Sequence, residues 1–233
     1  MHHSRLSTLV LDCHCDDLRD ACLELRSPGP VTGNDLRADE KPVVIITGAN
    51  SGGKSTFLRG VGVAQLMMQC GLFVTAQSYR ANVTSGVFTH FIREEDPTMT
   101  SGRLDDELRR MSALADRIGR HGLVLFNESF AGTNEREGSE IGYQVVRALL
   151  DARVRVFFVT HRFDFADRFL RQHAPFTVFL RAGRQPGGTR DYKLTEEPPL
   201  PTSFAEDIYY RVGGWLEEDP AEAAARSLPN ISR

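Results

Sequence analysis

Eight residues, 48–55, carry the spacing that most directly suggests chemistry. They read Gly-Ala-Asn-Ser-Gly-Gly-Lys-Ser, a glycine-rich run that ends in lysine and serine. Glycines let successive backbone N–H groups point at one anion, a lysine can reach the outer phosphates of a nucleotide, and a serine hydroxyl can ligate Mg²⁺. We expect a phosphate-binding loop here, with a chance glycine-rich turn as the alternative. The residues expected around the phosphates are Gly48, Ala49, Asn50, Ser51, Gly52, Gly53, Lys54, Ser55 and Thr56.

A second polar pair, Asn127 and Glu128, follows the apolar run of residues 123–126. Polar residues at the carboxyl end of a buried strand lie where ligands bind in open α/β sheets. We expect Glu128 to be the general base for an attacking water, and a surface carboxylate is the alternative. Ser55, Asn127 and Glu128 are the candidate metal ligands. Because Asn127 lacks the charge of an aspartate, either Mg²⁺ binding is weaker or the charge is supplied elsewhere.

One histidine, His161, ends a further apolar run, residues 154–160. At the same edge of the sheet it can donate a hydrogen bond to a γ-phosphate and sense its loss. The alternative is a structural histidine that caps the next helix. The candidate catalytic residues are therefore Glu128, Lys54, His161 and Asn50.

The elements that must position these residues alternate between strands and helices. β-Branched runs predict strands, and apolar residues at three- and four-residue steps predict helices. The expected order is strand 43–47, helix 54–69, one or two strands in 82–92, helix 103–119, strand 123–127, helix 136–151, strand 154–160 and helix 163–171. This alternation predicts an α/β fold with a mostly parallel central sheet flanked by helices.

The two ends of the chain differ from this core. Residues 6–26 predict an amphipathic helix that includes Cys15 and Cys22 on its apolar face, followed by a connection over 27–41. Buried thiols are expected, although a Cys-His-Cys metal site is the alternative. A hairpin is expected from strands 176–181 and 190–195, followed by a helix that begins at Ser203. The expected domains are 1–40, a helix and connector that could be the remnant of a longer protein, 41–216, and a tail over 217–233.

Composition excludes several classes of protein. With 28 Lys and Arg against 31 Asp and Glu, the net charge is −3, and no basic stripe typical of a dedicated nucleic-acid binder is present. No apolar run is long enough to cross a membrane, and the first residues lack the apolar core of a secretory signal. We therefore expect a cytoplasmic protein with no membrane partner.

Several motifs, in this order along the chain, resemble those of the MutS family. Residues 47–56 are similar to its Thr-Gly-Pro-Asn-x-Gly-Gly-Lys-Ser-Thr sequence, and 101–103 to its Ser-Gly-Arg segment. Residues 127–138 are similar to Asp-Glu-x-x-x-Gly-Thr-x-x-x-x-Gly, and Thr160-His161 to its Thr-His pair. Tyr192-Lys-Leu and the helix from Ser203 are similar to its C-terminal hairpin and helix. The resemblance covers about residues 30–213.

The resemblance implies an ABC-type P-loop ATPase domain that hydrolyses ATP with Mg²⁺ and works as a homodimer. Ser101 and Gly102 of one subunit would approach the γ-phosphate bound by the other, although a simple helix cap is the alternative. Asn50 would position the γ-phosphate or the water, and Thr133 and Asn134 would lie near the dimer seam. ATP state would be coupled to conformational change on DNA, which other regions of the protein would contact.

Three departures from the family pattern are visible. Ala49 stands in the place of proline, Asn127 in the place of aspartate, and residues 104–107 are acidic where small and apolar residues are usual. We also expect that no mismatch-reading or clamp domain fits in this chain, so mismatch recognition does not carry over to this sequence. A nucleotide-gated dimerisation module with little or no hydrolysis stays open as an alternative. An ATPase of a transporter is a weaker one, since no Leu-Ser-Gly-Gly-Gln segment is present.

Overall fold

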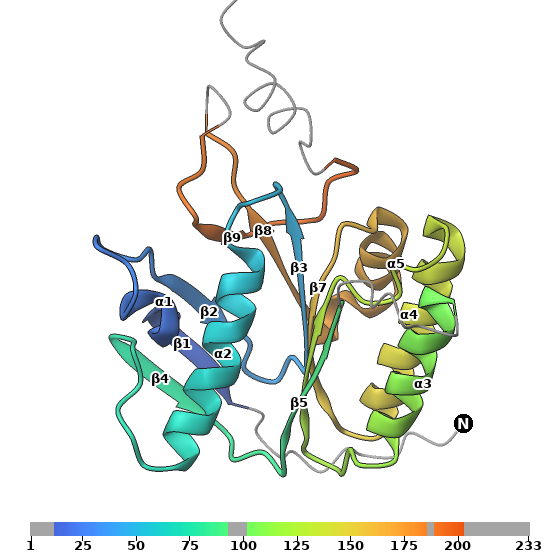
Figure 1. The fold of residues 1–233 in the computed structure, drawn as a ribbon, viewed down its shortest axis with the longest axis horizontal. Helices are drawn as coiled ribbons and strands as arrows, with labels where there is room; N and C mark the ends of the chain where they lie inside the picture. Colours follow the sequence, from blue (N-terminus) through green and yellow to red (C-terminus); the bar gives the residue numbers. More distant parts are fainter. Residues whose placement is uncertain (1–11, 93–101, 186–188, 203–233) are drawn as a thin grey trace, which may run out of the picture.

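The computed structural model describes residues 12–92, 102–185 and 189–202, and within them the chain forms two sheets (Figure 1). The larger sheet has the strand order β5-β6-β7-β3-β8-β9, in which only β9 is antiparallel to its neighbour. Its strands are β3 (Val43–Gly48), β5 (Val87–Phe91), β6 (Leu123–Asn127), β7 (Arg155–Val159), β8 (Thr177–Ala182) and β9 (Leu194–Glu196). The predicted α/β class with a mostly parallel sheet is confirmed.

Helices cover both faces of the larger sheet (Figure 1). Helix α2 (Lys54–Gln69) lies on one face, and α3 (Arg103–Ala115), α4 (Glu135–Asp151) and α5 (Phe163–His173) lie on the other. A short 3₁₀ helix, η1 (Ala174–Phe176), leads from α5 into β8. Most predicted boundaries in this part of the chain agree to within about four residues, and those of α2 and β6 agree at both ends.

The central strand β3 is buried along its whole length, because it pairs in parallel with β7 on one side and β8 on the other. Its side chains alternate between the two faces. Val44 and Ile46 belong to the cluster under α2, and Val43 and Ile45 to the cluster under α3, α4 and α5. A continuous apolar run is what a strand covered on both faces requires.

The smaller sheet corrects the prediction of a helix over residues 6–26. It is antiparallel, with the order β2-β1-β4, and consists of β1 (Cys13–Leu18), β2 (Asn34–Arg37) and β4 (Ser78–Ala81). Within 6–26 the described helix is only α1 (Ala21–Glu24), and β2 lies inside the predicted connection 27–41. The register of β1 shifts between Cys15 and Leu18, and Asp17 has a φ of 52°. Because of this bulge, the buried residues Cys15 and Leu18 are three positions apart in the sequence, which is a spacing typical of one face of a helix.

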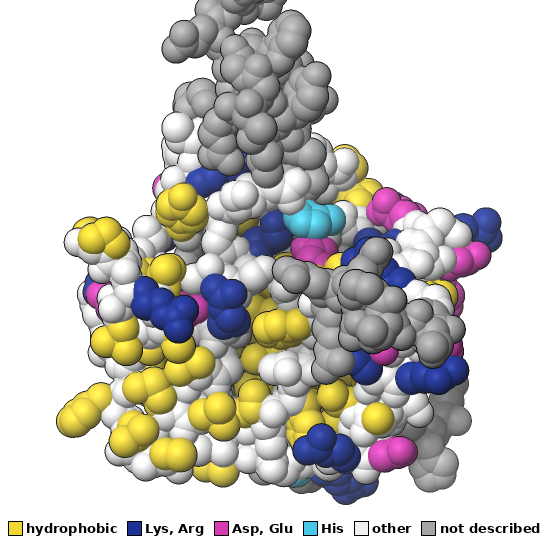
Figure 2. Space-filling view, viewed as in Figure 1, with side chains coloured by type: hydrophobic (Ala, Val, Ile, Leu, Met, Phe, Trp, Pro, Cys, Tyr) yellow, Lys and Arg dark blue, Asp and Glu magenta, His cyan; other side chains and the backbone are white. Residues whose placement is uncertain are grey.

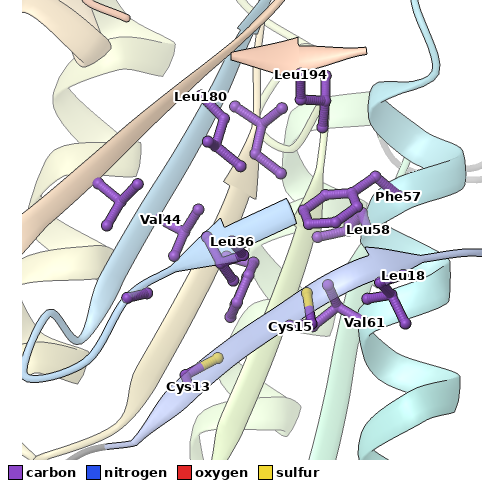
Figure 3. Close-up of a cluster of buried hydrophobic side chains, with 14 of the residues drawn as sticks. Cys13, Cys15, Leu18, Leu36, Val44, Phe57, Leu58, Val61, Leu180 and Leu194 are labelled. Carbon is purple, nitrogen blue, oxygen red and sulfur yellow. The ribbon is translucent and has the colours of Figure 1, made fainter. Parts of the chain in front are cut away.

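The expectation of buried thiols is half right. Cys13 and Cys15 are buried, while Cys22 and Cys70 are exposed. Figure 3 shows both buried cysteines in the apolar cluster that joins the smaller sheet to α2 and β3, a cluster that also contains Leu36, Val44 and Phe57.

Apolar side chains also gather on the surface over α2 and β4 (Figure 2). Phe73 is 96% exposed, and Leu66, Leu72 and Val83 are also exposed. Residues 71–73 are therefore exposed in the connection between α2 and β4, while Val74 packs against the core cluster.

The C-terminal part confirms the expected hairpin, since β8 and β9 pair antiparallel. The helix expected from Ser203 and the tail expected over 217–233 lie outside the described residues. Asn34 of β2 joins this hairpin to the smaller sheet. Its side chain donates to the Tyr192 carbonyl (3.1 Å) and accepts from the Leu194 N–H (2.7 Å).

Asn34→Ala should destabilise the fold, because it leaves the Leu194 N–H and the Tyr192 carbonyl without these partners. Asn34 is 5% exposed, and the loss should be about 2 kcal/mol in the free energy of unfolding. Denaturant titration measures it. Asn82→Ala is the matched control, since the Asn82 side-chain oxygen has no hydrogen-bond partner among the described residues. Equal losses for the two variants would contradict the link between the sheets.

Candidate functional site

The glycine-rich loop joins the end of β3 to the start of α2, and two of its glycines are required by backbone conformation. Gly48 has a φ of 96°, and a Cβ there would lie 2.5 Å from the Ala182 carbonyl oxygen. Gly53 has a φ of 87° and stands directly before α2. The loop leads directly into the N-terminus of α2, a helix of 16 residues, so the free N–H groups and the partial positive charge of that helix end face the loop. The strand, loop and helix context expected from the sequence is present.

The lysine of the loop is buried. Lys54 is 5% exposed, and its Nζ donates to the carbonyls of Gly48 (3.0 Å) and Ala49 (2.8 Å). Burial lowers the pKa of Lys54 to about 8; the negative charge of Glu128 opposes this shift and Arg190 adds to it. Arg190 also donates from Nε to the Asn50 carbonyl (3.0 Å), a contact that nothing in the sequence pattern predicted.

The candidate metal ligands Ser55 and Asn127 are in contact. The Ser55 hydroxyl donates to Oδ1 of Asn127 at 2.7 Å, so two neutral oxygens meet beside the loop. Neutral oxygens of this kind are hard ligands that suit Mg²⁺, which keeps several of its waters in most protein sites. In the described part of the chain, no group of three or more His, Cys, Asp and Glu is placed to hold a metal.

The structure also brings Glu128 and His161 together at the ends of adjacent strands. Nε2 of His161 lies 2.9 Å from Oε1 of Glu128, and the His161 backbone N–H donates to Oε2 at 3.2 Å. Glu128 has a φ of 53°, a conformation that costs a non-glycine residue energy and that clusters at functional sites. Its own N–H donates to the Val159 carbonyl, which fixes the turn after β6.

Most of these groups line one cavity of about 630 Å³, and Asn127, which is not among the lining residues, contacts it through Ser55. Residues 50–56 of the loop and α2, Glu128 and His161 belong to its lining. The lining also includes residues outside the predicted site, among them Leu23, Val31 and Tyr192. The predicted hairpin contained Tyr192, but no pattern indicated that the hairpin returns to the loop.

Of the remaining predicted residues that the structure describes, Gly48, Ala49, Gly102, Thr133 and Asn134 are not among those that line this cavity. Ser101 is outside the described residues, and Gly102 is exposed at the start of α3 and is not among the cavity-lining residues. Asn134 caps α4 by accepting from the Glu137 N–H at 3.0 Å, and Thr133 hydrogen-bonds to the Glu137 carboxylate.

Comparison with known proteins identifies the family. The family model described as MutS domain V matches residues 44–184, which is more than half of the chain. The chain belongs to the MutS family. It is 31% identical to MutS protein homolog 4 of Mus musculus over 132 residues, which cover 57% of this chain and 14% of that protein.

Two bacterial members of the MutS family give similar values. The DNA mismatch repair protein MutS of Thermotoga maritima is 34% identical over 143 residues, covering 61% of this chain and 18% of that protein. Endonuclease MutS2 of Lacticaseibacillus casei is 32% identical over 146 residues, covering 62% of this chain and 19% of that protein. The chain thus matches less than one fifth of the length of each of these relatives. No helix among the described residues is both long enough and apolar enough to span a membrane.

The buried lysine predicts a pH-dependent stability. With a folded-state pKa of about 8 against an ordinary value of 10.5, Lys54 binds fewer protons in the folded than in the unfolded protein between these pH values. The free energy of unfolding therefore rises through this window. Compared with Lys54→Met, the wild type should gain up to about 3 kcal/mol between pH 7 and pH 10.5.

Denaturant titrations at a series of pH values measure this difference. Lys41→Met, at a lysine whose side chain is 35% exposed, is the control for the general effects of alkaline pH. If the difference in the free energy of unfolding between wild type and Lys54→Met stayed constant from pH 7 to pH 10.5, the result would contradict the desolvation of Lys54.

Proposed function

We propose that this chain is a Mg²⁺-dependent ATPase domain that hydrolyses ATP between two copies of itself. The observation that carries the proposal is that the loop, Ser55 and the Glu128–His161 pair line one cavity, with Asn127 in contact with Ser55. The donor set and the glycine-lined loop fit a triphosphate with its metal. Membership in the MutS family supports the same assignment.

The residues have distinct roles in this proposal. When the nucleotide binds, the Lys54 ammonium replaces its hydrogen bonds to two loop carbonyls with hydrogen bonds to phosphate oxygens. The loop N–H groups and the start of α2 bind the remaining phosphate oxygens. Ser55 and Asn127 would hold Mg²⁺, which neutralises charge on the β- and γ-phosphates when bound. Asn50 lies in the same loop, where it can help to position the γ-phosphate or the water.

Water activation is assigned to the pair at the strand ends. Glu128 orients the attacking water and accepts its proton, because its carboxylate is the acidic group that lines the cavity beside the loop. His161, whose Nε2 contacts Glu128, can donate to the γ-phosphate and return to the carboxylate once that phosphate has left. Hydrolysis by such a site depends on positioning and charge neutralisation more than on covalent chemistry.

The homodimer completes the site in this proposal. Ser101 and Gly102 of one subunit approach the phosphate held by the other, while Thr133 and Asn134 lie at the seam. The name of the Thermotoga maritima relative connects that protein to DNA mismatch repair, and we propose that ATP state here controls a conformational change on DNA. Other parts of the protein would contact the DNA, in keeping with the net charge of −3 of this chain.

A nucleotide-gated dimerisation module with little hydrolysis is the second candidate. Asn127 favours it, because the oxygen that meets Ser55 belongs to a neutral carboxamide and not to a carboxylate. In that case ATP would drive dimerisation while the metal-assisted step stayed slow.

Glu128→Gln should bind ATP with little change and lose about 10²- to 10⁴-fold in turnover, because an amide accepts hydrogen bonds but not the proton. Steady-state phosphate release and equilibrium ATP binding measure the two quantities. Glu140→Gln, which alters an exposed carboxylate on α4, is the matched control and should keep wild-type turnover. Equal turnover in Glu128→Gln and wild type would remove Glu128 from the catalytic role.

Asn127→Asp should lower the Mg²⁺ concentration needed for half-maximal turnover by about fivefold, since a charged acceptor is worth about 1 kcal/mol more than a neutral one. Titration of Mg²⁺ at fixed ATP measures this. Gln77→Glu is the control, because it adds the same charge at an exposed residue that does not line the cavity. An unchanged Mg²⁺ requirement in Asn127→Asp would show that the missing charge is supplied elsewhere.

A further inference from the structure

A loop of six residues, Ser129 to Asn134, connects the proposed base Glu128 to the start of α4. It is tightly packed: Ser129 is 2% exposed, Phe130 is fully buried, and Phe130 has a φ of 63°. Such a loop keeps its shape only if its backbone polar groups find partners. The partners come from two elements on opposite sides of it.

Arg162, the residue after His161, holds the loop from one side. Its guanidinium donates to three loop carbonyls, those of Phe130 (2.8 Å), Thr133 (3.0 Å) and Asn134 (2.9 Å). Gly138 of α4 makes room for it, since a Cβ there would lie 2.5 Å from the Arg162 Cζ. The rigid fork of an arginine suits several acceptors at fixed positions in a way that a lysine does not.

Glu107 of α3 holds the loop from the other side. It is 2% exposed, and its Oε2 accepts from the Gly132 N–H at 3.4 Å. Burial raises the pKa of Glu107, while the Gly132 N–H and the charges of Arg103, Arg110 and Arg162 oppose the shift. Its second oxygen has no hydrogen-bond partner among the described residues, so this carboxylate is kept in the interior at a cost.

Helix α3 is attached to the loop at two further points. A Cβ on Gly132 would lie 2.8 Å from the Leu104 nitrogen, so the loop backbone packs directly on the first turn of α3. His90 of β5 bridges the other end: its Nε2 lies 3.1 Å from the Glu107 carbonyl, and its Nδ1 lies 2.7 Å from the Ser129 hydroxyl.

We propose that Arg162 and Glu107 are positioning residues that lock the 129–134 loop between the Glu128–His161 pair and helix α3, so that this pair and α3 move together. The inference rests on the proposed function and adds a mechanical link to it. A change at His161 would reach Arg162 through one peptide bond, then the loop, then Glu107 and the start of α3, where Gly102 lies. Glu107 belongs to the acidic segment 104–107, which differs from the MutS family pattern, so the proposal assigns this segment a function.

The first test separates turnover from binding. Arg162→Lys keeps the charge but cannot meet three carbonyls, and Glu107→Ala removes the acceptor for Gly132. Each should lower kcat about tenfold and leave the Kd for Mg-ATP within about twofold. Glu107→Gln keeps an acceptor oxygen and should restore kcat to within about threefold of wild type. Arg168→Ala, which breaks a contact between α5 and α4 away from the loop, is the matched control.

The double variant tests whether the two residues act through the same loop. Combined, Arg162→Lys and Glu107→Ala should lower kcat little further than the worse single variant, because either change already frees the loop. Full multiplication of the two effects, or single variants with wild-type kcat, would overturn the proposal. Thermal unfolding of every variant identifies losses that come from misfolding.

A second readout needs binding but no turnover. Hydrogen exchange is compared with and without Mg-ATP, at a concentration where all variants share one subunit state. In wild type and Glu107→Gln, Mg-ATP should slow amide exchange about fivefold or more both in residues 51–55 and in α3. In Arg162→Lys and Glu107→Ala only residues 51–55 should respond.

The outcomes of this exchange experiment distinguish the two ideas. An α3 response that persists in both loop variants, or one that is absent from a wild type whose residues 51–55 respond, would overturn the link. No response at residues 51–55 in wild type would overturn the proposed function and the link with it.

Discussion

The parallel pairing of β3 with β7 and β8 is the constraint on which the rest of the structure depends. It buries all six residues of β3 and brings the ends of three strands to one edge. Gly48 begins the glycine-rich loop at that edge, and β7 delivers His161 two residues after its last residue. Because β6 pairs with β7 in the same direction, Asn127 and Glu128 arrive beside them. The chemistry at this edge follows from strand order more than from any single contact.

The rest of the cavity lining comes from residues between Leu23 and Asn34 and from Tyr192, so it depends on the smaller sheet and the C-terminal hairpin. Asn34 ties these two parts together, and the cavity-lining Tyr192 belongs to the connection that Asn34 holds. The buried cluster around Cys13, Cys15 and Leu36 attaches the smaller sheet to α2 (Figure 3). The loop and these residues therefore line the same cavity, which favours a ligand with a charged and an apolar end.

Much of this arrangement can be predicted from local patterns, and the failures have physical reasons. The apolar run before Asn127 predicts β6 at both ends because a doubly covered strand is continuous in sequence. The helix expected over 6–26 is wrong because the bulge at Asp17 mimics helical spacing. No local sequence pattern indicates the contacts of Arg162, because its partners are backbone carbonyls 28 to 32 residues away, and any residue type can supply a carbonyl.

The central claim is that two copies of this chain form a Mg²⁺-dependent ATPase site, and the most direct measurement is the rate of phosphate release per subunit as protein concentration rises. The account predicts a rate that climbs with concentration and reaches a plateau as dimers form, with sizing of the same samples showing the change in subunit state. ATP binding with no phosphate release at any concentration would contradict it and favour the nucleotide-gated module.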